Sequence, residues 1–377
     1  MKLFKQTPTI DFVSKFKFFK YISISLVVVS FLAFIILGLN YGVDFSGGTE
    51  AQIRFDRNLN TEEIRNALSS FGRISLQKFE GRDDEFLIRM PGVSIIDETE
   101  VDSFISSLKS KVAGKAEITK QHFDVDVGDR IELWFDASVD DNVIVEVARK
   151  NEVPVTGTVE YSRVGQRHIY KIMLESITNK MINVLNSDLD VETEIQRVDL
   201  VGPRVGEKLR QSAFISVIFA LMAILIYIAL RFNYQFAPGA VAALAHDVLI
   251  VLGIFSVFRV PFDLTIVAAL LTTVGYSLND TIVVYDRIRE NWNNSKKGAN
   301  VPEKINTSIN ETLSRTLLTS VTTLLVLITL LIIGGGIIRG FALAMTLGVF
   351  VGTYSSIFVA SPVTIAIENY LKKREAR

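Results

Sequence analysis

One pair of charged residues has the types and spacing for chemistry inside an apolar part of this sequence. Asp280 interrupts the apolar residues 264–285, and Arg315 stands at the start of the next apolar stretch. A carboxylate in hydrocarbon is costly, so Asp280 must face protein or water and have a partner. Burial and a nearby guanidinium act on the protonation of such a carboxylate in opposite directions, so small rearrangements can switch it. We therefore expect Asp280 and Arg315 to meet and to form a site that can take up and release a proton. The alternatives are a static ion pair and, for Arg315, a side chain that reaches the membrane surface.

Further polar residues recur at helical spacing around this pair, so each set lies on one face of its helix. They are Thr272, Thr273, Tyr276 and Asn279 before Asp280, and Thr319, Thr322 and Thr323 after Arg315. We expect Tyr276, Asn279, Thr319 and Thr323 to line the proton pathway or to pack helices together. On the last apolar stretch, the small residues Gly348, Gly352, Ser356 and Ala360 form a ridge that predicts close helix packing.

A second polar pair, His246 and Asp247, lies within the apolar residues 236–258. Adjacent residues on a helix point ~100° apart, so we expect no hydrogen-bonded dyad between these two side chains. Asp247 is expected either to help hydrate the pathway or to hold helices together by hydrogen bonding.

The composition removes several other kinds of chemistry. The 377 residues include no cysteine, which excludes disulfides, thiolate metal sites and cysteine nucleophiles. The three histidines are too scattered for a metal cluster, so we predict no metal site and no cofactor. A net charge of −1 gives no basic face for nucleic acid. Because phosphate-loop and zinc-protease motifs are absent and intramembrane protease motifs are incomplete, we predict that the protein is not an enzyme.

Six apolar stretches are long enough to span a bilayer, which takes roughly 20 residues. They cover residues 21–39, 211–230, 236–258, 264–285, 316–338 and 341–367. The first is longer than the core of a signal peptide and no cleavage motif follows it, so we interpret it as a retained helix.

The distribution of lysine and arginine predicts how these spans are oriented. Basic residues concentrate in the tails 1–20 and 368–377 and in the loop 286–314, whereas the two short loops of the opposite side hold only Arg259 and Arg339. Positive charge stays in the cytosol, so both tails and this loop are expected there and residues 41–208 outside.

The external segment 41–208 has the pattern of an α+β domain. Apolar faces of two helices are predicted at Ile64, Ala67, Leu68 and Phe71, and at Val101, Phe104, Ile105 and Leu108. With the strands around them, the order is βαββαβ, the ferredoxin-like arrangement. A weak similarity recurs about 80 residues later. We predict two tandem ferredoxin-like units, near 49–124 and 130–202; the alternative is one sheet domain with a long insertion.

Four motifs lie at the membrane borders and within the spans. They are residues 40–49 (NYGVDFSGGT), 199–206 (DLVGPRVG), 275–291 (GYSLNDTIVVYDRIREN) and 312–320 (TLSRTLLTS). In the first two, Asp44, Gly47, Gly48, Gly202 and Pro203 are expected to shape hinges between the helices and the external domain. Together the motifs closely resemble the SecF branch of the SecD/SecF family, six-span subunits that work with SecD on the bacterial Sec translocon. The resemblance covers all six spans and both ends of the external domain.

This resemblance implies an RND-type membrane half whose movement protons drive, with Asp280 and Arg315 in proton conduction. It implies a subunit of the bacterial inner membrane, with cytosolic termini and a periplasmic domain. With SecD it would use the proton motive force to promote protein export through SecYEG. Unfolded exported polypeptide, YajC and YidC would be further partners, and Asp247 could also bind SecD. The alternative is half of an RND-type, proton-driven exporter of small hydrophobic molecules or lipids. Familiar SecF proteins have a single small external domain, so two units would be a departure.

Overall fold

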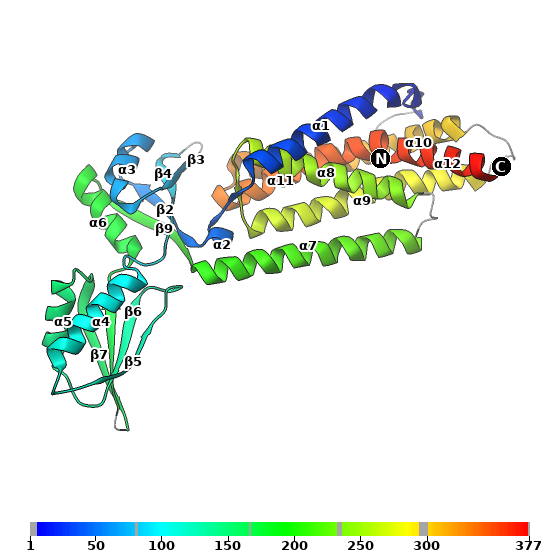
Figure 1. The fold of residues 1–377 in the computed structure, drawn as a ribbon. Helices are drawn as coiled ribbons and strands as arrows, with labels where there is room; N and C mark the ends of the chain where they lie inside the picture. The colour runs from blue at the N-terminus through cyan, green and yellow to red at the C-terminus, as the bar shows by residue number, and fades with distance from the viewer. Residues whose placement is uncertain (1–5, 80–81, 166, 232–235, 294–300, 376–377) are drawn as a thin grey trace. The chain divides into compact units, whose positions relative to one another are not determined.

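The membrane spans belong to a helical unit of residues 1–41 and 212–377, and residues 42–211 form a separate α/β unit. The computed structural model describes residues 6–79, 82–165, 167–231, 236–293 and 301–375 (Figure 1). Within these ranges, six helices are long and apolar enough to cross a membrane. Their elements are α1 (Phe16–Leu37), α7 (Pro203–Arg231), α8 (Ala237–Val257), α9 (Leu264–Asn293), α10 (Val301–Ile333) and α11 (Gly336–Ser355), which a π-helical segment, η3 (Ser356–Ala360), joins to α12 (Ser361–Glu375). The prediction of a helical membrane fold is confirmed.

Some predicted boundaries at α9, α10 and α11 are wrong. The expected loop 286–314 is largely helical, because α9 continues to Asn293 and α10 already begins at Val301; residues 294–300 lie outside the described part of the chain. Charged side chains there stabilise helix by pairing: Arg287 contacts both Glu290 and Glu311 at 2.6 Å. The expected spans 316–338 and 341–367 are also displaced, since α10 ends at Ile333 and α11 begins at Gly336.

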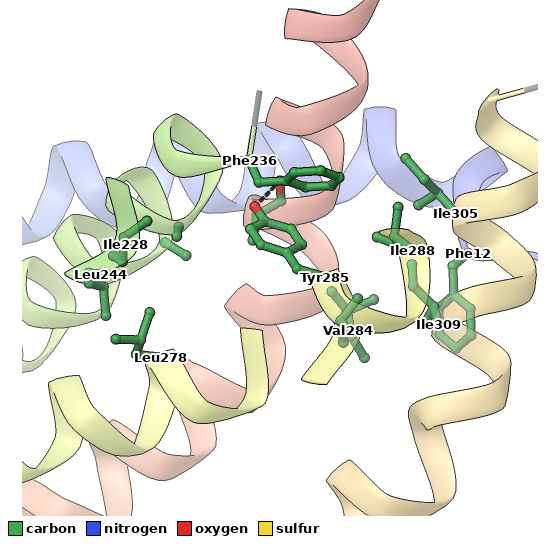
Figure 2. Close-up of a cluster of buried hydrophobic side chains, with 14 of the residues drawn as sticks. Phe12, Ile228, Phe236, Leu244, Leu278, Val284, Tyr285, Ile288, Ile305 and Ile309 are labelled. Carbon is green, nitrogen blue, oxygen red and sulfur yellow. Dashed lines mark hydrogen bonds between the residues drawn. The ribbon is translucent and has the colours of Figure 1, made fainter. Parts of the chain in front are cut away.

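A buried apolar cluster joins several helices near the ends that carry these charged residues. At its centre, Tyr285 of α9 packs against Phe236 with ring centroids 5.1 Å apart, and its hydroxyl donates to the carbonyl of Ala360 at 3.1 Å (Figure 2). Phe12, from the segment before α1, lies in the same cluster as Ile309 of α10. The N-terminal segment is therefore part of the folded core of the helical unit.

The predicted ridge of small residues packs α11 against α9. Gly348 faces Thr273, and a Cβ placed on Gly352 would lie 2.8 Å from the Cβ of Ser277. Ser356 and Ala360 of the ridge are fully buried. The prediction of close packing is confirmed, and it leaves no room for a larger side chain between α9 and α11 at Gly348 and Gly352.

The α/β unit contains two antiparallel sheets of four strands each. Its elements follow the short helix α2 (Val43–Ser46). In chain order they are β2 (Gly48–Phe55), α3 (Thr61–Ala67), β3 (Ser75–Phe79), β4 (Arg82–Met90), α4 (Glu98–Val112), β5 (Ile118–Phe123), β6 (Arg130–Phe135), α5 (Asp141–Lys150), β7 (Val155–Val164), β8 (Arg167–Leu174), α6 (Ile177–Leu189) and β9 (Thr193–Val201).

These two sheets are nested in the chain and are not tandem. The first sheet has the order β3-β4-β2-β9 and the second β5-β6-β8-β7. The predicted units 49–124 and 130–202 are therefore wrong, because β5 pairs with β6 and β9 returns to pair with β2. The open alternative, a sheet domain with a long insertion, describes the chain better. The insertion, from α4 to β8, has a sheet of its own.

Each sheet has its own apolar core, which helices cover on one face. In the first, α3 and α6 bring Ile64 and Met181 onto the inward residues of β2 and β4. In the second, α4 and α5 bring Phe104 and Ile144 onto β6 and β8. The predicted inward residues Leu68, Val101, Ile105 and Leu108 are buried as well. The periodicity of the sequence thus located the helical faces although it misassigned the sheets.

Candidate functional site

Asp280 is sealed inside the helical unit, with a hydroxyl as its hydrogen-bond partner. Its side chain on α9 is 2% exposed. Ser320 of α10 donates to its Oδ2 at 3.4 Å, and the same Ser320 Oγ lies 2.7 Å from Oγ1 of Thr353 on α11. One carboxylate is thereby linked through two hydroxyls to both neighbouring helices.

Arg315 makes no direct ion pair with Asp280 among the residues that the structure describes, although its charge lies close enough to act on that carboxylate. Its side chain is exposed at the surface of α10 and lines a cavity of about 370 Å³ together with Asn279, Asp286, Arg287 and Glu311. The two predicted relay residues thus flank the same region without meeting. Asn279, which precedes Asp280 in the chain, also lines this cavity, so the cavity lies between residues of α9 and α10.

Asp247 is a second fully buried carboxylate, with three hydrogen bonds. Its Oδ2 accepts from Ser277 of α9 at 2.5 Å and from Ser355 of α11 at 2.8 Å, and its Oδ1 lies 2.9 Å from Nδ1 of His246. The expectation that His246 and Asp247 form no dyad is wrong: although their Cβ atoms diverge, both side chains are long enough to bend toward each other. The imidazole also stacks on Tyr354, with ring centroids 5.9 Å apart.

Of the remaining predicted pathway residues, some bond between helices and one bonds within its own helix. Tyr276 of α9 donates to Thr323 of α10 at 3.1 Å, so these two do connect the helices as expected of a polar stripe. Thr319 donates to the carbonyls of Arg315 and Thr316 on its own helix, at 3.1 and 2.9 Å. Its hydroxyl therefore has its bonds within α10.

The structure adds four hydroxyl residues to the predicted site: Ser277, Ser320, Thr353 and Ser355. A sequence signal existed for two of them, because Ser277 lies one helical turn before Asp280 and Ser320 closes the motif 312–320. Hydroxyls in apolar helices commonly bond to the backbone of their own helix, as Thr319 does. Sequence alone therefore does not separate these hydroxyls from those that bond to a buried carboxylate.

The predicted hinge residues converge where the α/β unit begins and ends. Gly48 pairs with Val201 at one end of the β2–β9 ladder. A Cβ on Gly47 would lie 2.9 Å from the Cα of Pro203, and one on Gly202 would collide with Asp126. Asp44 lies in the short helix α2 just before them. Asp126 in turn accepts from the backbone N–H of Arg204 at 2.8 Å, which caps the first turn of α7.

A bundle of apolar helices with two carboxylates and their hydroxyl partners sealed inside defines a polytopic membrane protein with an internal ionisable site. Profiles of known families identify it further. The profile described as "Protein export membrane protein SecD/SecF, C-terminal" matches residues 181–370, and the "SecD/SecF GG Motif" profile matches residues 32–58. The chain belongs to the SecD/SecF family of protein export membrane proteins.

Individual relatives agree with this family. The chain is 34% identical to protein translocase subunit SecF of Vibrio alginolyticus, over 97% of this chain and 92% of that protein. It is 34% identical to the SecF subunit of Calditerrivibrio nitroreducens, over 99% of both chains. A crystal structure of SecDF, a translocon-associated membrane protein from Thermus thermophilus, superposes with a TM-score of 0.65 at 29% identity. That alignment covers 97% of this chain and spans 40% of the longer SecDF chain.

Proposed function

We propose that this protein is the SecF-type subunit that works with SecD and uses the proton motive force to promote protein export through SecYEG. The observation that carries the proposal is Asp280. A carboxylate that is 2% exposed in an apolar helix bundle, with hydroxyls and no described cation pair beside it, is expensive to keep unless its ionisation is used. Moving one charge across the membrane is worth roughly 2.3 kcal/mol per 100 mV, so repeated protonation can drive movement of the helices.

In this proposal Asp280 takes up and releases the proton, and Arg315 controls whether a proton can reach or leave the Asp280 carboxylate. The guanidinium lines the cavity of about 370 Å³ that Asn279 also faces, next to the buried carboxylate. Rotation of α10 would bring Arg315 toward Asp280, so that Arg315 would replace Ser320 as the partner of the Asp280 carboxylate. Proton release would then be favoured with the guanidinium close, and uptake with the hydroxyl close.

The basic tails and helix ends support an orientation with both termini in the cytosol of a bacterium and the α/β unit in the periplasm. There we propose two ferredoxin-like layers, one inserted in the other, that contact emerging unfolded polypeptide. SecD supplies the second six-span half, in keeping with the SecDF structures, and YajC and YidC are further partners. A subunit of this kind carries out no covalent reaction.

The test is Asp280→Asn in a bacterial strain depleted of its own SecF, which receives this full chain with its SecD. Asn is nearly isosteric and can still accept from Ser320, so the variant should reach the membrane at the normal level. Export of a secreted reporter should nevertheless slow strongly. Asp190→Asn is the matched control, because Asp190 is exposed, has a left-handed backbone with a φ of 51°, and an asparagine suits that position. Normal export with Asp280→Asn would end the proposal.

A further inference from the structure

Asp247 ties together three helices around the site that contains Asp280. It belongs to α8, and its carboxylate accepts from Ser277 on α9 and Ser355 on α11. Asp247 is 1% exposed, and both serines are fully buried. The third hydrogen bond, with His246, comes from its own helix and fixes the remaining oxygen. The carboxylate therefore sets how far α9 and α11 stand from α8 at this level of the bundle.

The same two helices carry Asp280 itself and Thr353, and Ser320 of α10 joins these two residues. Ser277 precedes Asp280 by one helical turn on α9, and Thr353 lies just before Ser355 on α11. Between them, Ser320 contacts both Asp280, at 3.4 Å, and Thr353, at 2.7 Å. A hydroxyl bridge of this kind depends on the spacing of α9, α10 and α11, because hydrogen bonds weaken as donor and acceptor move apart.

The hydrogen bond between Asp247 and Ser355 lies at an irregular point of α11. Ser355 is the last α-helical residue before the π-helical segment Ser356–Ala360. A π segment replaces the i→i+4 backbone bonding of the α-helix with i→i+5 bonding, and such segments are frequent at functional sites. Ser355 is thus held by Asp247 at the residue where the helix changes its winding.

We propose that Asp247 is a positioning residue for Asp280. By holding Ser277 and Ser355, it aligns α9 and α11 so that Ser320 and Thr353 meet the Asp280 carboxylate. The inference rests on the proposed proton relay through Asp280. It assigns Asp247 no proton of its own: the role requires oxygen acceptors on a side chain of this size, and not a negative charge.

This distinction separates asparagine from alanine at position 247. An asparagine oxygen can accept from both serine hydroxyls, as Oδ2 of Asp247 does. Its amide N–H can donate to Nδ1 of His246 if the imidazole carries its proton on Nε2 instead. Nε2 has no partner among the described residues, so this change of tautomer breaks no other bond. Alanine removes all three acceptor contacts at once.

The experiment measures export of the secreted reporter by the full chain with SecD, in the same SecF-depleted strain. Asp247→Ala should slow export at least about tenfold, the scale of losses from a misplaced reacting group. Asp247→Asn should recover most of that loss at equal membrane levels. A double-mutant cycle adds Ser320→Ala: the double variant Asp247→Ala, Ser320→Ala should be no slower than the slower single variant, because both act on one hydroxyl bridge.

Three results would overturn the proposal. The first is normal export with Asp247→Ala, and the second is a loss with Asp247→Asn as large as with Asp247→Ala. The third is a double variant Asp247→Ala, Ser320→Ala whose loss of export equals the product of the losses in the two single variants. If Asp247→Ala fails to accumulate, Ser355→Ala takes its place, because it removes one of the three contacts; normal export by this variant would then also count against the proposal. Asp280→Asn reports separately on the relay: normal export there defeats the proposed function, whereas a block there with any of the three results defeats only this inference.

Discussion

The hydroxyl of Ser320 lies 3.4 Å from Oδ2 of Asp280, whereas a cationic partner, Arg315, was expected there. A neutral donor next to a buried carboxylate satisfies its hydrogen bonding without balancing its charge. A guanidinium in contact would do both and would hold the ionised form firmly. The arrangement is therefore compatible with the proposed proton binding at Asp280, while Arg315 lines the neighbouring cavity.

This relationship predicts the ranking of two single variants by stability. Arg315→Leu removes an exposed side chain and should change the free energy of unfolding by no more than about 0.5 kcal/mol. Ser320→Ala removes the hydroxyl bonded to a buried carboxylate and should cost about 1–3 kcal/mol. Unfolding of the purified full chain in detergent measures both. If Asp280 and Arg315 instead formed a buried ion pair, Arg315→Leu would be the worse variant, by about 3–5 kcal/mol.

The site illustrates which features a single sequence can predict. An aspartate inside a long apolar run identified Asp280 directly, because a carboxylate is so costly to bury in a membrane span that its presence there indicates a functional site. The partners of Asp280 were harder to predict, since arginine is the obvious counter-ion whereas Ser320 is one of many hydroxyls in these helices. The dyad of His246 and Asp247 was missed because helical spacing describes where Cβ atoms point and not how far longer side chains bend.

The α/β unit shows the corresponding limit for folds. Alternation and helical periodicity depend on neighbours in the chain, so they located the buried faces of α3 and α4. Pairing between strands depends on residues far apart in the chain. β9 is separated from its partner β2 by the whole insertion, yet pairs with it from Gly48 to Phe55. The weak repeat in the sequence aligned strands and helices that are about 80 residues apart. It does not indicate which sheet each strand joins.

Nesting predicts which fragments of the α/β unit fold alone. Every buried residue of the second core lies between Ile96 and Leu174, and α4 begins with a capping box at Asp97. A fragment of residues 95–175 should therefore fold as a cooperative monomer in reducing buffer. The tandem fragment 49–124 should not, since it lacks β6 and β9. Circular dichroism and thermal unfolding distinguish the two. Cooperative folding of 49–124 together with disorder in 95–175 would contradict the nested arrangement.

The buried Glu85 on β4 predicts that the stability of the first sheet depends on pH in the acid range. Burial raises the pKa of Glu85, but hydrogen bonds from Arg82 and Gln52 outweigh it and hold that pKa below its ordinary value. A lowered pKa in the folded state means that the carboxylate stabilises the sheet fully above the unfolded pKa, about 4.3. This stabilisation is lost as the pH falls through the lower, folded pKa.

Amide hydrogen exchange in β2 and β4 of the full chain should therefore lose protection as the pH is lowered below about 4.3, once intrinsic rates are corrected. Glu85→Gln should make that protection less dependent on pH in the same range. Glu194→Gln is the control, because Glu194 contacts the same Arg54 but is 69% exposed. An unchanged acid response in Glu85→Gln would mean that other carboxylates are responsible.

The start of β2 should tolerate no side chain at Gly48. Its backbone has a φ of +124°, and a Cβ there would collide with the carbonyl oxygen of Met90, whose residue pairs with Thr49 in the ladder. Gly48→Ala should therefore incur backbone strain of about 1–3 kcal/mol and a packing cost of about 1–3 kcal/mol. Gly72→Ala is the matched control in the same part of the chain, because Gly72 has a φ of +80° but nothing lies within 4 Å of a Cβ there. Amide exchange of β2, β4 and β9 in the full chain should accelerate much more in Gly48→Ala than in Gly72→Ala. Export should fall with it, since β2 and β9 lead directly to the two helices that enter and leave this unit. Equal exchange in the two variants would mean that backbone conformation alone, and not the contact with β4, requires glycine at the start of β2.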